Sequence, residues 1–144
     1  MPFHYLARGV IFVNGKVLLV RQKGAGHTFL PGGHIEFGEK AEVALTREIL
    51  EETGMQALVK RFIGAVECAW VENDQPNHEI DLVFEVEASG LDPDEPQQFH
   101  ESHLEFIWLR PDELKAHNLL PEPLIECLVN WERGYRGYWG SSIQ

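Results

Sequence analysis

Three glutamates near the middle of the chain have the residue type and the spacing of a metal-binding helix face. A helical stripe of small apolar residues contains Ala41, Ala44 and Leu45. Steps of three, four and seven residues from these positions reach Glu48, Glu51 and Glu52, so the carboxylates lie on or beside that stripe. Mutual repulsion and the helix dipole both disfavour such a cluster in the last turns of a helix. A compensating cation is therefore expected.

The ligand atoms indicate which cation this would be. Carboxylate oxygens suit hard divalent ions such as Mg²⁺ or Mn²⁺, and the sequence lacks the clustered cysteines or paired histidines typical of zinc sites. Val43 and Leu50, one heptad apart on roughly the opposite side, predict that the helix is buried there too and that the carboxylates line a cleft. The alternative is a solvated acidic surface on which Arg47 and Glu51 form an ordinary (i, i+4) ion pair.

The loop before this helix favours the functional interpretation. Gly32 and Gly33 form a turn whose backbone can approach a ligand or an ion closely. The helix is expected from about Glu39 to Thr53, with Glu39 in its first turn and Gly54 as its left-handed C-terminal residue. The loop and the carboxylates together indicate phosphate chemistry.

The same residues resemble a known family signature. The stretch from Gly33 to Met55, GHIEFGEKAEVALTREILEETGM, is similar to the Nudix box: a glycine, five residues, Glu, seven residues, then Arg-Glu-apolar-x-Glu-Glu-x-Gly-apolar. The matching positions are Gly33, Glu39, Arg47, Glu48, Ile49, Glu51, Glu52, Gly54 and Met55. The resemblance implies a Nudix hydrolase of the α/β class, an α/β/α sandwich around a central mixed sheet.

The resemblance also implies a set of metal ligands and a cofactor. Glu48, Glu51 and Glu52 match the family's metal carboxylates, and the carbonyl of Gly32 is similar to a further ligand. The ion would be Mg²⁺ or Mn²⁺. Arg47 would orient a ligand carboxylate through its guanidinium fork, with simple pairing on the helix surface as the alternative.

Two more glutamates receive expected roles. Glu39 matches the first glutamate of the box, and the alternative is that it caps its own helix. A general base outside the box is often found on a later loop in this family, and Glu101 is our candidate, with Glu105 second. The alternatives are that one of the box glutamates is the base and that Glu101 is a solvated loop acid.

The implied reaction is hydrolysis of the diphosphate linkage of a nucleoside triphosphate or a nucleoside diphosphate derivative, by attack of water on phosphorus. The metal would offset phosphate charge and lower the pKa of a bound water. Arg21 and Lys23, just before the glycine loop, are candidate phosphate-binding residues, although ordinary surface positions are the alternative. The partner would be a small phosphorylated nucleotide.

The nucleobase contacts are less defined. Candidate stacking aromatics, which could equally be core residues, are Phe29, Trp70, Phe99 and Trp108. Thr28 stands where many family members carry Trp, which puts the usual stacking platform in doubt.

Two other functions remain open at this point. A non-catalytic nucleotide-sensing module on the same fold would be expected to lose box glutamates, and this chain keeps them. A diphosphate isomerase of related fold is disfavoured by the intact box and by the lack of a nearby cysteine.

Composition bounds the remaining classes. The 144 residues are expected to form one domain, residues 1–144. A net charge of −11 argues against stable nucleic-acid binding, and no apolar run approaches the ~18 residues of a membrane span. The two cysteines, Cys68 and Cys127, lack any metal-type spacing and are expected to be reduced thiols in a cytoplasmic protein. A homodimer is plausible from base rates.

The elements that position the box can also be predicted. Tyr5–Val13 and Lys16–Arg21 form a hairpin through Asn14-Gly15, and their nearly continuous apolar runs predict strands that are covered on both faces. The segment 78–86 is expected to be a half-buried strand, with Ile80 and Leu82 inward and Glu79 and Asp81 outward.

The C-terminal part is predicted to hold a helix from about Pro123 to Glu132, ending at Gly134. The aromatic tail that follows is interpreted as a lid on the body or a dimer contact.

Overall fold

The computed structural model describes residues 2–95 and 102–144, which form two β-sheets and two α-helices. The elements are β1 Phe3–Val10, β2 Phe12–Val13, β3 Lys16–Gln22, β4 Gly32–His34, α1 Ala41–Thr53, β5 Ala57–Glu72, β6 Gln75–Ala88, β7 Leu104–Leu109, the 3₁₀ turn η1 Pro111–Glu113, α2 Pro123–Glu132 and β8 Tyr138–Ser141. The five-stranded sheet has the order β4-β1-β6-β5-β8, and the three-stranded sheet has the order β2-β3-β7.

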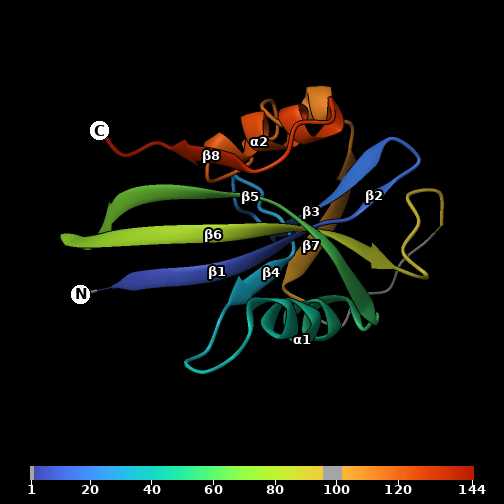
Figure 1. The fold of residues 1–144 in the computed structure, drawn as a ribbon, viewed down its shortest axis with the longest axis horizontal. Coiled ribbons are helices and arrows are strands. Elements are labelled where there is room, and N and C mark those ends of the chain that lie inside the picture. Colours follow the sequence, from blue (N-terminus) through green and yellow to red (C-terminus); the bar gives the residue numbers. More distant parts are fainter. Residues whose placement is uncertain (1, 96–101) are drawn as a thin grey trace.

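The larger sheet is mixed, and the helices lie on opposite sides of the strands. Strand β1 runs parallel to β6 and antiparallel to β4, while β5 runs antiparallel to β6 and parallel to β8. Figure 1 shows α2 above the strands and α1 below them. Leu45 and Ile49 of α1 belong to one buried cluster, and Leu124 and Leu128 of α2 belong to the other. The expected α/β sandwich with a mixed sheet is confirmed.

The first hairpin is formed, but its first strand is interrupted. Asn14 and Gly15 have φ values of 52° and 78°, as a type I′ turn requires, and join β2 to β3. The stretch expected as one strand divides after Val10, so that β1 belongs to the large sheet and β2 to the small one. The two-faced character of β3 is confirmed, because Leu18 and Leu19 lie in different core clusters.

Helix α1 begins two residues later than expected and ends as predicted. Its first residue is Ala41, and Gly54 closes it in the left-handed conformation with φ 75°. Val43 and Leu50 are 55% and 40% exposed, so the expectation that this side is also buried is wrong. The helix packs one face on the sheet and leaves the other face to solvent.

Strand β6 reverses the predicted inside and outside over its first half. Asp81 is fully buried and Glu79 is nearly so, whereas Ile80 and Leu82 are only partly buried. The reason is that β6 lies between β1 and β5, and the Arg8 side chain from β1 donates a hydrogen bond to Asp81 at 3.2 Å. A hydrogen-bond partner makes a buried polar side chain tolerable inside.

The aromatic tail is part of the sheet. Strand β8 pairs in parallel with residues 64–67 of β5. Tyr138 packs against the core on the α2 side and donates its hydroxyl hydrogen to Glu126 Oε2 at 2.9 Å, while Tyr135 and Trp139 are exposed. The tail is therefore an edge strand rather than a lid. Within the described residues, no helix is long and apolar enough to cross a membrane.

Candidate active site

Two consecutive glycines at the start of the loop before α1 allow close packing for different reasons. Gly32 has φ 138°, and a Cβ there would lie 2.0 Å from the backbone carbonyl oxygen of Ala7 on β1. At Gly33 a Cβ would lie 2.5 Å from the carboxyl carbon of Glu48. Gly32 therefore lets β4 approach β1 closely, and Gly33 leaves room beside β4 for the carboxylate of Glu48.

Glu52 ties the helix to the same loop. Its side chain is buried near the end of α1, and its Oε1 accepts a hydrogen bond from the backbone N–H of Gly32 at 2.9 Å. A charged acceptor strengthens such a bond. Glu48 and Glu52 thus reach neighbouring glycines, Gly33 and Gly32.

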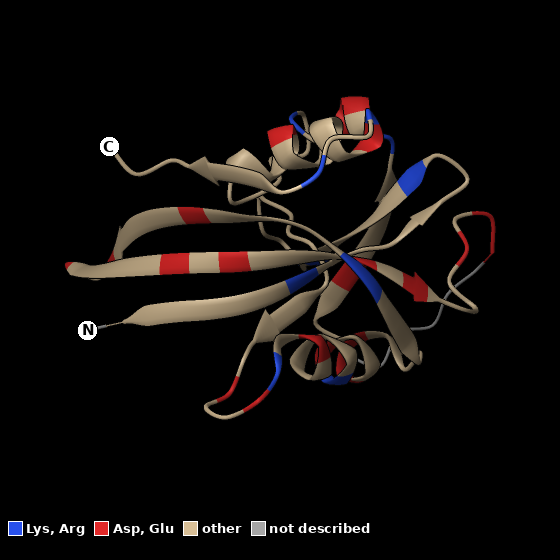
Figure 2. Cartoon of the chain, viewed as in Figure 1, with Lys and Arg blue, Asp and Glu red and all other residues tan. Residues whose placement is uncertain are grey.

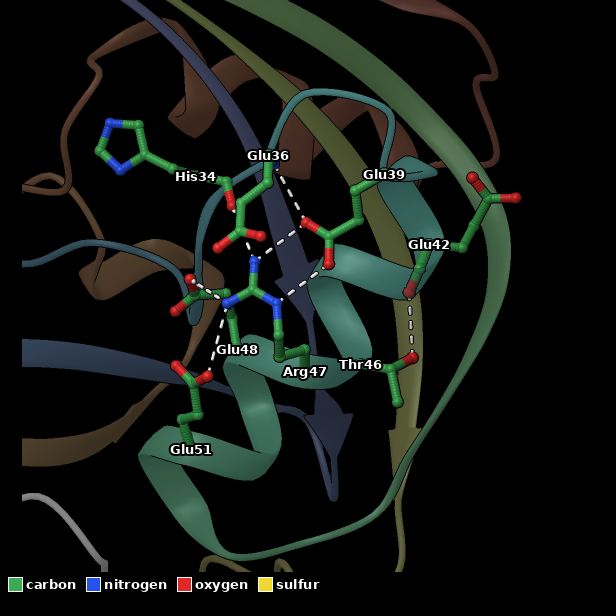
Figure 3. A network of polar contacts seen from close by, with 8 residues as sticks. All are labelled: His34, Glu36, Glu39, Glu42, Thr46, Arg47, Glu48 and Glu51. Atoms are coloured by element: carbon green, nitrogen blue, oxygen red, sulfur yellow. Dashed lines mark hydrogen bonds and ion pairs between the residues drawn. The ribbon is translucent and has the colours of Figure 1, made fainter.

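Arg47 forms hydrogen bonds with Glu39, Glu48 and Glu51, as Figure 3 shows. Its Nη1 donates to Glu48 Oε1 at 3.1 Å and to Glu51 Oε1 at 3.4 Å. Its Nε and Nη2 each donate to an oxygen of Glu39 at 3.0 Å, and Nη2 also reaches the carbonyl of His34 at 3.1 Å. These contacts raise the pKa of Arg47, chiefly through Glu39. The expected orienting role has a geometric basis, and a simple surface pair with Glu51 is the weakest of its contacts.

Glu39 does not cap α1. Lys40 is the N-cap residue and makes no side-chain cap, so Glu39 lies outside the helix rather than in its first turn. The Arg47 guanidinium and then the backbone N–H of Glu36 hold the pKa of the Glu39 carboxyl below its usual value. Glu39 connects the loop to the middle of the helix, which sequence spacing alone did not indicate.

The three box carboxylates differ in exposure and in charge balance. Glu52 is buried, Glu48 is partly buried, and the Glu51 side chain is 52% exposed. Burial raises the pKa of Glu48, and the neighbouring Glu51 carboxylate raises it further, against the opposing effect of Arg47. The Glu48 carboxylate is therefore partly removed from water and lies beside a second acidic group.

The donor set fits a hard divalent cation in its chemistry. It consists of the carboxylate oxygens of Glu48 and Glu52 beside Gly33 and Gly32, with Glu51 on the same helix. Among residues 2–95 and 102–144, however, no three His, Cys, Asp or Glu side chains are already arranged as a metal cluster. Glu48 and Glu51 turn toward Arg47 instead. Binding an ion would require these side chains to reorient.

The other predicted residues lie elsewhere or outside the described part. Arg21 donates twice to Glu105 Oε2, at 3.0 and 2.8 Å, across β3 and β7, so these two candidates neutralise each other. Lys23 has its backbone N–H bonded to the carbonyl of His103. Among the contacts of described residues, neither cation touches the box. Glu101 lies outside the described residues.

The candidate stacking aromatics also differ in their surroundings. Trp70 is 37% exposed and stacks on the ring of His4 at 5.2 Å, whereas Trp108 packs against the core on the α1 side. Phe99 lies outside the described residues. Thr28 is buried and donates its hydroxyl hydrogen to the carbonyl of His117, so it has a structural role here.

Sequence reasoning missed a polar pair next to the box. Arg8 on β1 pairs in register with Gly32 on β4, and its Nε donates to Asp81 Oδ1 at 3.2 Å. Its Nη1 donates to the carbonyl of Leu30 at 3.0 Å, and its guanidinium lies 5.3 Å from the centre of the Phe29 ring. The available signal was a lone arginine inside an apolar run that was predicted to be covered on both faces.

Acidic side chains are not confined to this site. Figure 2 shows Asp and Glu on both helices and along β5 and β6. With a net charge of −11, the protein repels anions unless nearby cations offset its negative charge.

Comparisons with known proteins agree with the box and the fold. A family model described as the NUDIX domain matches residues 3–127. An ADP-ribose pyrophosphatase from Methanocaldococcus jannaschii is 38% identical over 85 residues, which are 57% of this chain and 49% of that protein, so the match spans about half of the relative. The phosphatase NudJ from Escherichia coli strain K12 is 28% identical over 137 residues, 92% of this chain and 86% of that protein.

Solved structures show the same arrangement. A UDP-X diphosphatase has a TM-score of 0.70 and 28% identity, with 97% of this chain and 67% of that chain covered. A NUDIX hydrolase from Nitrosomonas europaea has a TM-score of 0.71 and 25% identity, with 95% of this chain and 93% of that chain covered.

Proposed function

Since the chain belongs to the NUDIX family of hydrolases, we propose that it is a metal-dependent pyrophosphohydrolase that cleaves the diphosphate linkage of a nucleotide derivative. The proposal rests on one observation: the glycine loop before α1 contacts the carboxylates of that helix. Gly32 and Gly33 meet the carboxylates of Glu52 and Glu48, and Arg47 fastens the same helix to the loop. This arrangement supports a site for a phosphate-bound cation.

Mg²⁺ or Mn²⁺ held by Glu48, Glu51, Glu52 and the carbonyl of Gly32 would offset phosphate charge and lower the pKa of an attacking water. The side chains of the chain have separate tasks. Glu52 would keep one carboxylate fixed at the loop through the Gly32 N–H. Arg47 would limit the orientations of the Glu48 and Glu51 carboxylates.

Proton transfer and phosphate contacts are assigned to residues outside the box helix. We propose Glu101 as the general base that takes a proton from the attacking water, with Glu105 as second candidate. Lys23 and Arg21 are proposed to contact phosphate. For Arg21 and Glu105 this requires that their mutual ion pair opens when substrate binds.

Two of the relatives support a substrate class. Proteins named ADP-ribose pyrophosphatase and UDP-X diphosphatase act on a nucleoside diphosphate joined to another group. We propose the same class here, a nucleoside diphosphate derivative, with a nucleoside triphosphate second. Unpaired Cys68 and Cys127 are consistent with work in the cytoplasm.

The test is a turnover screen of the purified protein with Mg²⁺. The panel comprises nucleoside triphosphates, ADP-ribose, nucleotide sugars and dinucleoside polyphosphates, with released phosphate read directly or after phosphatase or pyrophosphatase coupling. Turnover on one class that disappears with EDTA would support the proposal. Binding of a nucleotide without turnover on any substrate would favour the alternative, a nucleotide-sensing module.

A further inference from the structure

Arg8 is a cation beside the box to which the proposed function gives no role. It lies on β1, directly opposite Gly32 on β4. The backbone N–H of Gly32 donates to Glu52, and the carboxyl group of Glu48 lies against the neighbouring Gly33. The register of β1 and β4 therefore places Arg8 beside the glycines that the proposed metal ligands contact.

Three contacts hold the guanidinium of Arg8, and its Nη2 takes part in none of them. Nε donates to Asp81, Nη1 donates to the Leu30 carbonyl, and the Phe29 ring lies beside the planar group. Among the described residues, no acceptor lies at Nη2. The side chain is 13% exposed. A fork that is fixed in this way loses little conformational freedom when it binds an anion.

The buried acid beside Arg8 does not cancel its charge. Asp81 Oδ2 is buried and accepts no hydrogen bond from a described residue. The carboxyl of Glu79 lies on the same face of β6, and two carboxyl groups can share a hydrogen bond only if one keeps its proton. Burial and this contact raise the pKa of Asp81 to about 8. At neutral pH the Asp81 carbonyl oxygen accepts from Arg8 while the guanidinium keeps its full positive charge.

We propose that Arg8 binds the diphosphate of the substrate, donating from Nη2 to a phosphate oxygen beside the box glutamates. This inference rests on the proposed function, because it takes the diphosphate to lie at the box. Asp81 acts through Arg8 as a positioning residue: it holds the fork in place and adds no net charge when protonated.

The experiment measures binding of inorganic pyrophosphate by calorimetry at saturating Mg²⁺, and of Mg²⁺ alone, for the wild type and three variants. Arg8→Gln is expected to weaken pyrophosphate binding on the order of tenfold to a hundredfold and to leave the Mg²⁺ affinity within about twofold. Arg8→Lys keeps the charge but not the fork, so an intermediate loss is expected. The matched control is Arg61→Gln, which removes an exposed arginine of β5.

Wild-type pyrophosphate affinity in Arg8→Gln would overturn the inference. If Arg8→Gln does not fold, because Asp81 then loses its partner, Arg8→Lys decides: an affinity equal to that of the wild type overturns the inference as well. A loss that appears equally in Mg²⁺ binding would mean a structural role only and would also overturn it.

Failure of the proposed function gives a different pattern. Arg8-dependent pyrophosphate binding without turnover on any substrate would remove the hydrolase proposal and leave the Arg8 site standing. Normal turnover with an unchanged KM in Arg8→Gln would overturn the Arg8 site and leave the hydrolase proposal standing.

Discussion

The guanidinium of Arg47 donates to both carboxylate oxygens of Glu39, from Nε and Nη2, at 3.0 Å in each case. The two residues are eight positions apart, and only Arg47 belongs to α1. The contact therefore joins the middle of the helix to the loop before it. Both side chains are partly exposed, so the pair adds little to stability and mainly fixes geometry.

Arg47→Lys is expected to lower kcat on the order of tenfold to a hundredfold, because an ammonium group cannot hold Glu39, Glu48 and the loop carbonyl together. The melting temperature should change by less than about 4 °C, a change of about 1 kcal/mol. Steady-state kinetics and thermal melts check both. Arg110→Lys, at an exposed pair with Asp112, is the matched control. Full activity in Arg47→Lys would remove the orienting role.

Glu52→Gln is expected to lower turnover by on the order of a hundredfold or more while the fold is retained. The amide oxygen can still accept from the Gly32 N–H, and the repulsion with Glu48 is relieved, so the melting temperature should equal or exceed that of the wild type. Glu42→Gln, an exposed acid in the first turn of the same helix, serves as control. Near-normal activity of Glu52→Gln at saturating Mg²⁺ would contradict the assignment of Glu52 as a metal ligand.

The two glycines of the loop should respond differently to alanine. Gly32→Ala places a Cβ against the backbone of Ala7 at a positive φ, and a cost of roughly 3 kcal/mol is expected, on the order of 10 °C in melting temperature. Gly33→Ala meets only the flexible end of Glu48, so stability should nearly hold while turnover falls. Melts and kinetics of both variants separate the two effects. Equal loss of stability in the two variants would contradict this account.

Asp81 should make stability depend on pH. Its pKa is raised from 3.8 to about 8, so the folded state holds a proton that the unfolded state releases. The contribution of this proton to the free energy of unfolding is complete below about pH 4 and is lost as the pH rises to about 8. Asp81→Asn keeps an acceptor for Arg8 and a donor for Glu79, so it should gain stability over the wild type as the pH rises.

Urea unfolding in EDTA at pH 5, 6.5, 8 and 9 measures this difference. The curves of wild type and Asp81→Asn should diverge with increasing pH and become parallel above about pH 8. Asp112→Asn, at an exposed acid, should follow the wild type. A constant difference between wild type and Asp81→Asn at all four pH values would show that Asp81 is ionised in the folded state.

The sequence predicted the elements that depend on local signals. The Asn14-Gly15 turn, the end of α1 at Gly54 and the helix Pro123–Glu132 all follow from backbone preferences of a few residues. The box was found because its spacing is regular within one helix. The fold class followed from the resemblance and from the continuous apolar strands.

The errors concern contacts between distant segments. Glu79 and Asp81 alternate with apolar residues as an exposed face would, and only the pairing of β1 with β6 brings Arg8 to Asp81. Val43 and Leu50 are apolar but exposed, because helical periodicity does not show how wide the buried face is. The contact of Glu39 with Arg47 likewise depends on the path of the loop.

The parallel pairing of β8 with β5 has a consequence for the assembly of the molecule. Residues 64–67 of β5 would form an open edge without it, with unpaired backbone groups able to accept a strand from another chain. Because β8 is far from β5 in the sequence, this edge stays open until residues 138–141 have folded onto it. Until then the edge of β5 can pair with a strand of another molecule, and the docking of Tyr138 against α2 ends that exposure.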